Sequence, residues 1–247
     1  TAAEAPDVFD QPMTAGKSPA LTPSSCDGAG LRMNFTVPPR QHKLTAMNDK
    51  PSVLLGSNLQ GQLLIAMPDM TDPRFHRSVV QICAHSDEGT MGLIVNKRID
   101  DLDLDSLLDQ IDLTDSMGDG NVSAESLRRP VHNGGPVEAN CGFVLHSPDY
   151  FSKEATLKVI DSICLTATTD ILAAVATGEG PHHALVALGY AGWSPGQLEG
   201  ELAANAWLNC PTDPDIVFAI DDDAKYDKAL SKLGIDPSHL VSTAGRA

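Results

Sequence analysis

Aromatic side chains and basic residues are both scarce in this chain of 247 residues. Aromatic residues make up 4% of the sequence, whereas hydrophobic residues as a whole make up 42%. A core with this composition must be mostly aliphatic, and the apolar content is ordinary for a folded globular protein. Lys and Arg number 17 against 33 Asp and Glu, so the formal net charge is −16.

The shortage of basic residues disfavours one class of partner. Residues 1–58 hold five acids and five bases, so the whole negative excess belongs to residues 59–247, with 28 acids and 12 bases. Proteins that bind DNA draw affinity from Lys and Arg side chains that displace counterions from the phosphate backbone. We therefore expect no direct binding to DNA.

Long apolar runs are also missing. No run approaches the roughly 18 apolar residues that a membrane-spanning helix needs, and the first residues lack the basic and apolar regions of a secretory signal. We expect a cytoplasmic protein without a membrane partner.

The cysteine pattern excludes two kinds of small domain. The five cysteines are odd in number, widely spaced and without a CxxC pair, which excludes a disulfide framework and a zinc ribbon. Cys83 and Cys164 lie in apolar runs and are expected in the core. Cys26, Cys141 and Cys210 lie in loop-like surroundings and are the candidates for a reactive thiol.

The histidines form no convincing metal site. His182 and His183 are adjacent, so their side chains point apart on a strand. His132, Cys141 and His146 could converge, but a hydrogen-bonded core histidine is the commoner outcome. We predict neither a metal nor a cofactor.

Composition divides the chain into a tail and one domain. Residues 1–58 are rich in Pro, Ser, Thr, Ala and Gly and show no sustained period, which predicts a disordered tail. Residues 59–247 contain short apolar runs typical of strands: QLLIAM (62–67), SVVQICAH (78–85), TMGLIVN (90–96), GFVLHS (142–147), SICLTAT (162–168), ALVALGY (184–190) and DIVFAI (215–220).

Helical patterns lie between these runs, at 103–111, 170–177, 194–207 and 222–233. The last pattern ends before Gly234, a residue suited to the position after a helix. Several strands are apolar on both faces, which indicates a sheet covered on both sides. The predicted fold is an α/β (α+β-like) sandwich, with a mixed β-sheet core and flanking helices.

Six segments keep their order along the chain and together resemble the AlgH/YqgE family. They are GQLLIAMP (61–68), DPRFHRSVV (72–80), EGTMGLIVNK (88–97), NGGPV (133–137), GFVLHS (142–147) and ALVALGYAGWSPGQLEGELAANAWL (184–208). The resemblance implies an α/β sandwich, a bacterial cytosolic protein and the family's traditional label of transcriptional regulator. It brings no catalytic residues, and it does not extend to residues 1–58.

One motif matches the G-x-S-x-G elbow of a hydrolase at Gly192–Gly196. The oxyanion hole of such an enzyme uses the backbone N–H after the nucleophile. Here that residue is Pro195, which has no N–H. We interpret Ser194 as a helix N-cap, with Gln197 reaching back to it, and expect no enzymatic activity.

Two groups of residues remain candidates for binding an anion. Gly189, Gly192 and Gly196 precede the helical pattern at 194–207, so the 189–197 strand–loop–helix could hold an anion or ligand, as in a small-ligand protein or enzyme; a tight turn explains them equally. The second group is basic and consists of Arg74, Arg77 and Lys97. Ion pairs with acids such as Asp72 or Asp100 are the simpler explanation for it.

The remaining candidate is a shallow apolar cleft that would receive an unidentified protein partner. The predicted lining residues are Gly134, Gly135, Pro136, Tyr190, Trp193, Gln197, Glu201, Asn205 and Trp207. Trp and Tyr often anchor interfaces, although burial in the core would also account for the tryptophans. The resulting hypothesis is a non-enzymatic regulatory or adaptor protein that acts through protein contacts.

Overall fold

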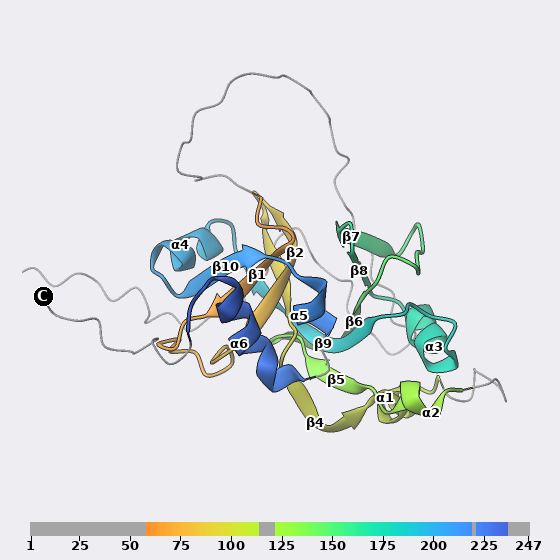
Figure 1. Ribbon diagram of the computed structural model, residues 1–247. Coiled ribbons are helices and arrows are strands. Elements are labelled where there is room, and N and C mark those ends of the chain that lie inside the picture. Colours follow the sequence, from red (N-terminus) through yellow and green to blue (C-terminus); the bar gives the residue numbers. More distant parts are fainter. Residues whose placement is uncertain (1–57, 114–121, 219–220, 237–247) are drawn as a thin grey trace, which may run out of the picture.

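The computed structural model describes residues 58–113, 122–218 and 221–236. Except for its last residue, the predicted tail (residues 1–58) therefore lies outside the described residues. The described ranges form one sheet of ten strands (Figure 1). The strands are β1 (Gln62–Ala66), β2 (Val79–Ser86), β3 (Gly89–Ile94), β4 (Arg98–Asp103), β5 (Pro130–Asn133), β6 (Val137–His146), β7 (Thr156–Ile160), β8 (Ile163–Thr166), β9 (Ala184–Trp193) and β10 (Trp207–Pro211).

The helices flank this sheet. They are α1 (Leu104–Gln110), α2 (Ala124–Leu127), α3 (Thr169–Thr177), α4 (Gln197–Ala203), α5 (Pro214–Phe218) and α6 (Asp222–Lys232). The main strand order is β10-β1-β2-β3-β9-β6-β8-β7, and β5 pairs with β9 and β4 beside this path. Of the pairs, β5 with β9 is parallel and the others are antiparallel.

The sheet is curled. The side-chain amide of Gln60, just before β1, donates to the main-chain carbonyls of Lys158 and Val159 in β7, at 3.2 Å each. This contact joins the first strand to the far end of the strand order. The expected mixture of sheet and helices is confirmed. The predicted sandwich architecture is confirmed only in part, because the sheet curls like half of a barrel.

Alternation along the strands produces separate cores on the two faces of the sheet. In β9, Leu185 and Ala187 belong to the core that α5 and α6 cover, whereas Val186 belongs to the core on the opposite face, shared with α1 and α3. The end of the same strand enters a third core, under α4. Successive side chains of a strand point to opposite faces, so one apolar strand contributes side chains to the cores on both faces of the sheet.

Two predicted elements need correction. The run at 215–220 is not a strand, because Pro214–Phe218 forms α5. Pro suits the first turn of a helix, and the Asp213 side chain accepts a hydrogen bond from the Asp215 N–H at 3.1 Å. The helix predicted over 194–207 is shorter, and it ends before Asn205, whose φ of 58° is incompatible with a continuing helix.

Other local predictions are confirmed. α6 covers Asp222–Lys232, and Gly234 follows it with a φ of 71°.

The sequence patterns do not predict the strands β4, β5, β7 and β10. β4 has the sequence RIDDLD and lies partly exposed at the edge beside β5, so its composition is polar and its strand pattern is weak.

Candidate functional site

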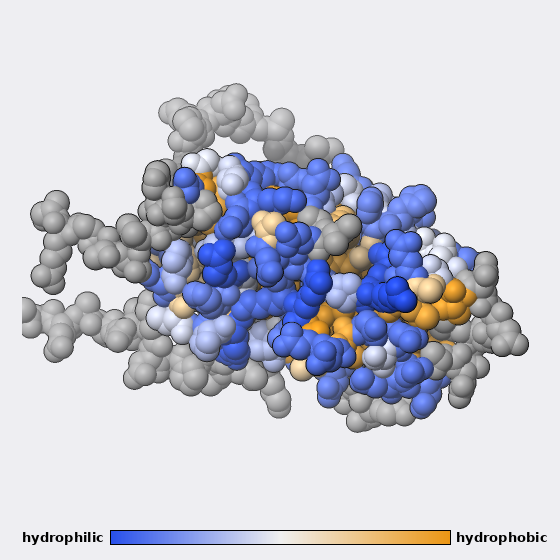
Figure 2. Space-filling model, turned by 60° about the horizontal axis from the view of Figure 1, so that its bottom comes forward, coloured by the Kyte–Doolittle hydropathy of each residue, from blue (hydrophilic) through white to orange (hydrophobic). Residues whose placement is uncertain are grey.

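A pocket of about 470 Å³ opens between the strands β4 and β5, the start of β9 and the helices α2, α5 and α6. Figure 2 shows the side of the molecule that lies at the bottom of Figure 1. That side is mainly hydrophilic, with apolar areas near its middle and toward its right edge (Figure 2). Cavities of this volume fall within the range of small-ligand sites.

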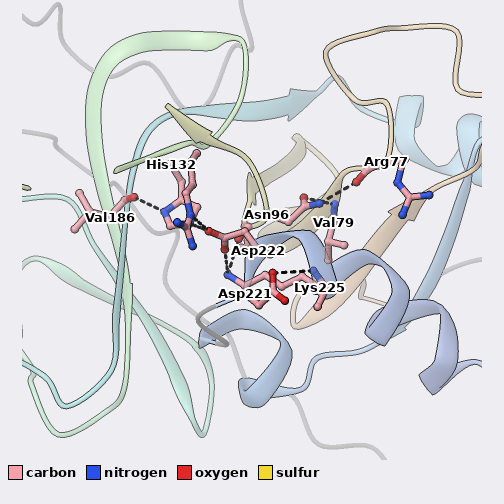
Figure 3. A network of polar contacts seen from close by, with 11 residues as sticks. Arg77, Val79, Asn96, His132, Val186, Asp221, Asp222 and Lys225 are labelled. Carbon is pink, nitrogen blue, oxygen red and sulfur yellow. Dashed lines mark hydrogen bonds and ion pairs between the residues drawn. The ribbon is translucent and has the colours of Figure 1, made fainter. Parts of the chain in front are cut away.

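The floor of the pocket is organised by Asp222, the first residue of α6. Its Oδ1 accepts a hydrogen bond from Lys225 Nζ at 2.7 Å, and its Oδ2 contacts His132 Nε2 at 3.2 Å and the Nε of Arg98 (Figure 3). Asp222 is 6% exposed, and Lys225 and His132 are 1% and 4% exposed. One buried carboxylate is therefore shared by three basic side chains from β4, β5 and α6.

The electrostatic environment keeps this carboxylate ionised. Burial raises the pKa of Asp222, but hydrogen bonds from His132, Lys225 and Arg98 outweigh it and hold the pKa well below its usual range. Burial lowers the pKa of Lys225, and the contact with Asp222 opposes that shift. Lys225 also donates to the Val95 carbonyl at 2.8 Å, so its ammonium group is hydrogen-bonded on two sides.

The rim of the pocket carries further basic groups and one aromatic surface. Arg129 donates to the Ala184 carbonyl at 3.4 Å, and Arg128 is exposed. Within the described ranges, neither arginine forms an ion pair with an acid. His183 stacks on Phe218 with ring centroids 5.6 Å apart and an interplanar angle of 22°.

The charges of the lining have an unusual sign for this protein. Four lining residues are Lys or Arg (Arg98, Arg128, Arg129 and Lys225), and two are acids (Glu125 and Asp222). With the histidines taken as neutral, the lining carries an excess of two positive charges, in a chain whose net charge is −16. The pocket is therefore suited to an anion, because local charges act more strongly than distant, solvent-screened ones.

The sequence does not predict this pocket. It suggests His132 as a neighbour of Cys141 and His146, but the ring nitrogens of His132 face the Val186 carbonyl and Asp222. The described part of the chain contains no group of three or more residues placed to hold a metal ion. The adjacent basic pairs at 128–129 and 182–183 were the available signal, since they stand out in an acidic domain.

The predicted apolar cleft needs correction, because its tryptophans belong to the core. Trp193 and Trp207 are each 2% exposed and pack edge to face, with centroids 6.0 Å apart. Both indole N–H groups donate to Oε2 of Glu201, at 2.9 and 2.8 Å, and Gln197 donates to its Oε1 at 2.9 Å. The polar stripe of α4 thus satisfies buried indoles, which need a partner.

The other residues of the predicted cleft are also occupied by internal packing. Tyr190 is 8% exposed and contacts the ring of Phe143. Gly134 and Gly135 are buried, and a Cβ on Gly135 would lie 2.2 Å from the Tyr190 carbonyl carbon. These glycines let the segment between β5 and β6 cross closely over β9. Pro136 and Asn205 are exposed.

In the 189–197 segment, predicted as a possible anion site, two of the three glycines are needed for internal packing. Cβ atoms on Gly189 and Gly192 would meet the Gly135 carbonyl and the Tyr190 ring, so both serve close packing. The N-cap of α4 is Gly196, not Ser194. Gln197 Oε1 nevertheless accepts the Ser194 N–H at 3.0 Å, so the predicted back-reaching bond is confirmed, while the hydroxyl cap is wrong.

The second predicted anion group is held by internal contacts. Arg74 pairs with Asp72 at 2.6 Å, as the simpler interpretation predicted. Arg77 pairs with Asp227 at 2.9 Å and lies over the ring of Tyr226. Lys97 donates to the Arg74 carbonyl at 2.9 Å.

The loop-like surroundings predicted for three cysteines are wrong for two of them. Cys141 lies in β6 and Cys210 in β10, and each is 2% exposed. Burial raises the pKa of the Cys210 thiol, which lowers its reactivity. Cys26 lies outside the described residues.

Membrane insertion through a helix finds no support in the described ranges, where every helix is too short or too polar to span a bilayer.

Comparison with known proteins places the chain among bacterial relatives. A family model described as AlgH-like matches residues 63–238. A UPF0301 protein of Methylobacterium nodulans is 52% identical over 206 residues, which cover 83% of this chain and 97% of that protein. A UPF0301 protein of Rhodopseudomonas palustris is 53% identical over 189 residues, which cover 76% of this chain and 89% of that protein.

Two solved structures resemble the fold. The solution structure of the AlgH protein from Pseudomonas aeruginosa has a TM-score of 0.62 and 39% identity, and the match covers 81% of this chain and all of that one. A crystal structure from Corynebacterium diphtheriae has a TM-score of 0.54 at 19% identity, over 79% of this chain and 92% of that one, and it supports the fold alone. The family expected from the six segments is thus shown by sequence and structure, and the chain belongs to the AlgH-like family.

Proposed function

We propose that this protein is a non-enzymatic, cytoplasmic regulatory protein whose primary event is the binding of a small anion in the pocket between β4, β5, β9, α2, α5 and α6. The observation that carries the proposal is the positive lining of this pocket in a strongly acidic chain. The bound state would then alter contacts with a protein partner, in keeping with the regulator label of the family.

The floor and the rim have different parts in this proposal. At the floor, Lys225 and His132 are both bound to the Asp222 carboxylate, so these two side chains support the architecture of the pocket. Arg128 and Arg129 at the rim are available to a ligand, because Arg presents a planar fork of donors that matches carboxylate and phosphate oxygens. Binding at the rim requires no displacement of the buried ion network.

A phosphate titration tests the binding event. We expect orthophosphate to shift the NMR signals of the His182 and His183 rings, and we expect Arg129→Gln to weaken binding by about tenfold or more. Arg74→Gln is the matched control, because Arg74 is an exposed arginine paired with Asp72 outside the pocket. Equal binding by the two variants would show that the pocket is not the anion site.

The regulatory part is tested by capturing partners from the bacterium's own cytosol with and without phosphate. The proposal expects a captured protein whose amount changes with phosphate for the native chain and not for Arg129→Gln. If a partner binds equally to the native chain and to Arg129→Gln, with and without phosphate, then partner binding does not depend on the pocket. Direct DNA binding is not part of the proposal, because the negative charge opposes it.

A further inference from the structure

The pocket combines features that narrow the class of its ligand. It joins a pair of rim arginines to an apolar and aromatic wall. The wall contains Ala184, Leu185, Val217 and the Phe218 ring, and the last is stacked on His183. A simple inorganic anion would use the arginines and leave this wall unused.

The cationic and aromatic parts lie close together. Arg129 Nη1 donates to the carbonyl of Ala184, the residue that directly follows His183. A compact ligand could therefore place one end at the guanidinium group and another against the ring pair. His183 is exposed and Phe218 is half-buried, so the two rings also present surface to the pocket.

The charge of the pocket points to a doubly charged group. The lining has an excess of two positive charges, which a phosphate monoester complements more fully than a single carboxylate, since the ester carries a charge of about −1.5 to −2 at neutral pH. Aromatic side chains stack on planar bases without strong dependence on the base.

We propose that the ligand is a phosphate monoester that carries a planar ring, of the mononucleotide class, with its phosphate at Arg128 and Arg129 and its ring against Phe218 and His183. This inference rests on the proposed function, because it names the ligand of the same pocket. The cavity of about 470 Å³ lies in the lower part of the range for small-ligand sites, which fits a mononucleotide better than a larger dinucleotide.

Calorimetric titration of the full chain with four probes separates the contribution of the phosphate to binding from that of the planar ring. The probes are adenosine 5′-monophosphate, ribose 5-phosphate, orthophosphate and adenosine. We expect the nucleotide to bind at least about fivefold more tightly than ribose 5-phosphate, because one stacked ring contributes a factor of this order. Adenosine should bind more weakly than the nucleotide, because it lacks the phosphate.

Variants assign the two parts of the ligand. His183→Ala should weaken the nucleotide about fivefold and leave ribose 5-phosphate unchanged, whereas Arg129→Gln should weaken both. Phe218→Leu is a second test of the ring, with Phe151→Leu as its matched control, since Phe151 is 61% exposed and does not line the pocket. Retained melting temperatures would show that the variants are folded.

The outcomes distinguish this inference from the proposed function. If the nucleotide and ribose 5-phosphate bind equally, the ring preference is refuted, and anion binding stands. If Arg129→Gln binds every phosphate probe as the native chain does, the pocket is not the site, and both proposals fail. Binding of none of the four probes would also overturn both.

Discussion

Replacement of Asp222 by Asn tests the buried ion network at the floor of the pocket. The variant keeps the size of the side chain but removes the negative charge that Lys225 and His132 share. These two side chains are 1% and 4% exposed, so water cannot replace the lost partner. Removal of one member of a buried ion pair costs about 3–5 kcal/mol, which for a domain of this size lowers the melting temperature by roughly 6–20 °C.

A matched aspartate on the surface provides the control. Asp227 pairs with Arg77 at 2.9 Å, but both side chains are about half exposed. Asp227→Asn should therefore change the free energy of unfolding by only about 0–1 kcal/mol. Urea unfolding followed by tryptophan fluorescence measures both variants. If Asp222→Asn loses no more stability than Asp227→Asn, the network does not contribute to stability as we argue.

The pH dependence gives an independent check with a definite sign. The pKa of Asp222 is lowered in the folded protein. Its contribution to stability is therefore complete above the unfolded-state pKa of about 3.9, and it is lost as the pH falls toward the folded-state pKa. The stability difference between the native chain and Asp222→Asn should be constant from pH 7 to about pH 5 and shrink below about pH 4. A difference that disappears between pH 7 and pH 5 would refute the assignment of this shift.

Two further substitutions test the region that the sequence suggested as a cleft. Trp193→Ala removes a ring that is 2% exposed and packs on Trp207, so the free energy of unfolding should fall by about 3–5 kcal/mol; a loss below about 1 kcal/mol in urea unfolding would contradict its place in the core. Ser194→Ala should change stability by less than about 0.5 kcal/mol in the same assay, because no hydrogen bond from the hydroxyl to α4 is present among the described residues. A loss of 1–2 kcal/mol would instead restore the predicted cap.

Local sequence patterns were enough to predict several elements of this fold. The apolar spacing over 222–233 and the glycine at position 234 indicated a helix and its end, and α6 follows both. The strands at 62–67 and 142–147 were recognisable because their side chains are buried on both faces. These patterns depend only on residues that are close in the sequence, so they predict a helix or strand without knowledge of the tertiary structure.

The sequence alone was ambiguous where different structures share one local pattern. The run at 215–220 is short and apolar, which suits either a strand or a buried helix, and the packing of Ile216 and Val217 under the sheet accompanies the helix. Trp193 and Trp207 were compatible with an exposed anchor or a core. Their burial depends on Glu201, which supplies an acceptor to both indoles.

The sequence by itself determined the family, the mixture of strands and helices, the negative charge and the mainly aliphatic core. Only the tertiary structure decided the candidate site. Asp222 meets His132 from 90 residues away and Arg98 from 124 residues away, and no local period connects these positions. The physical reason is that a buried charge is stable only among partners that the folded chain brings together. Its partners can therefore be identified only from the tertiary structure.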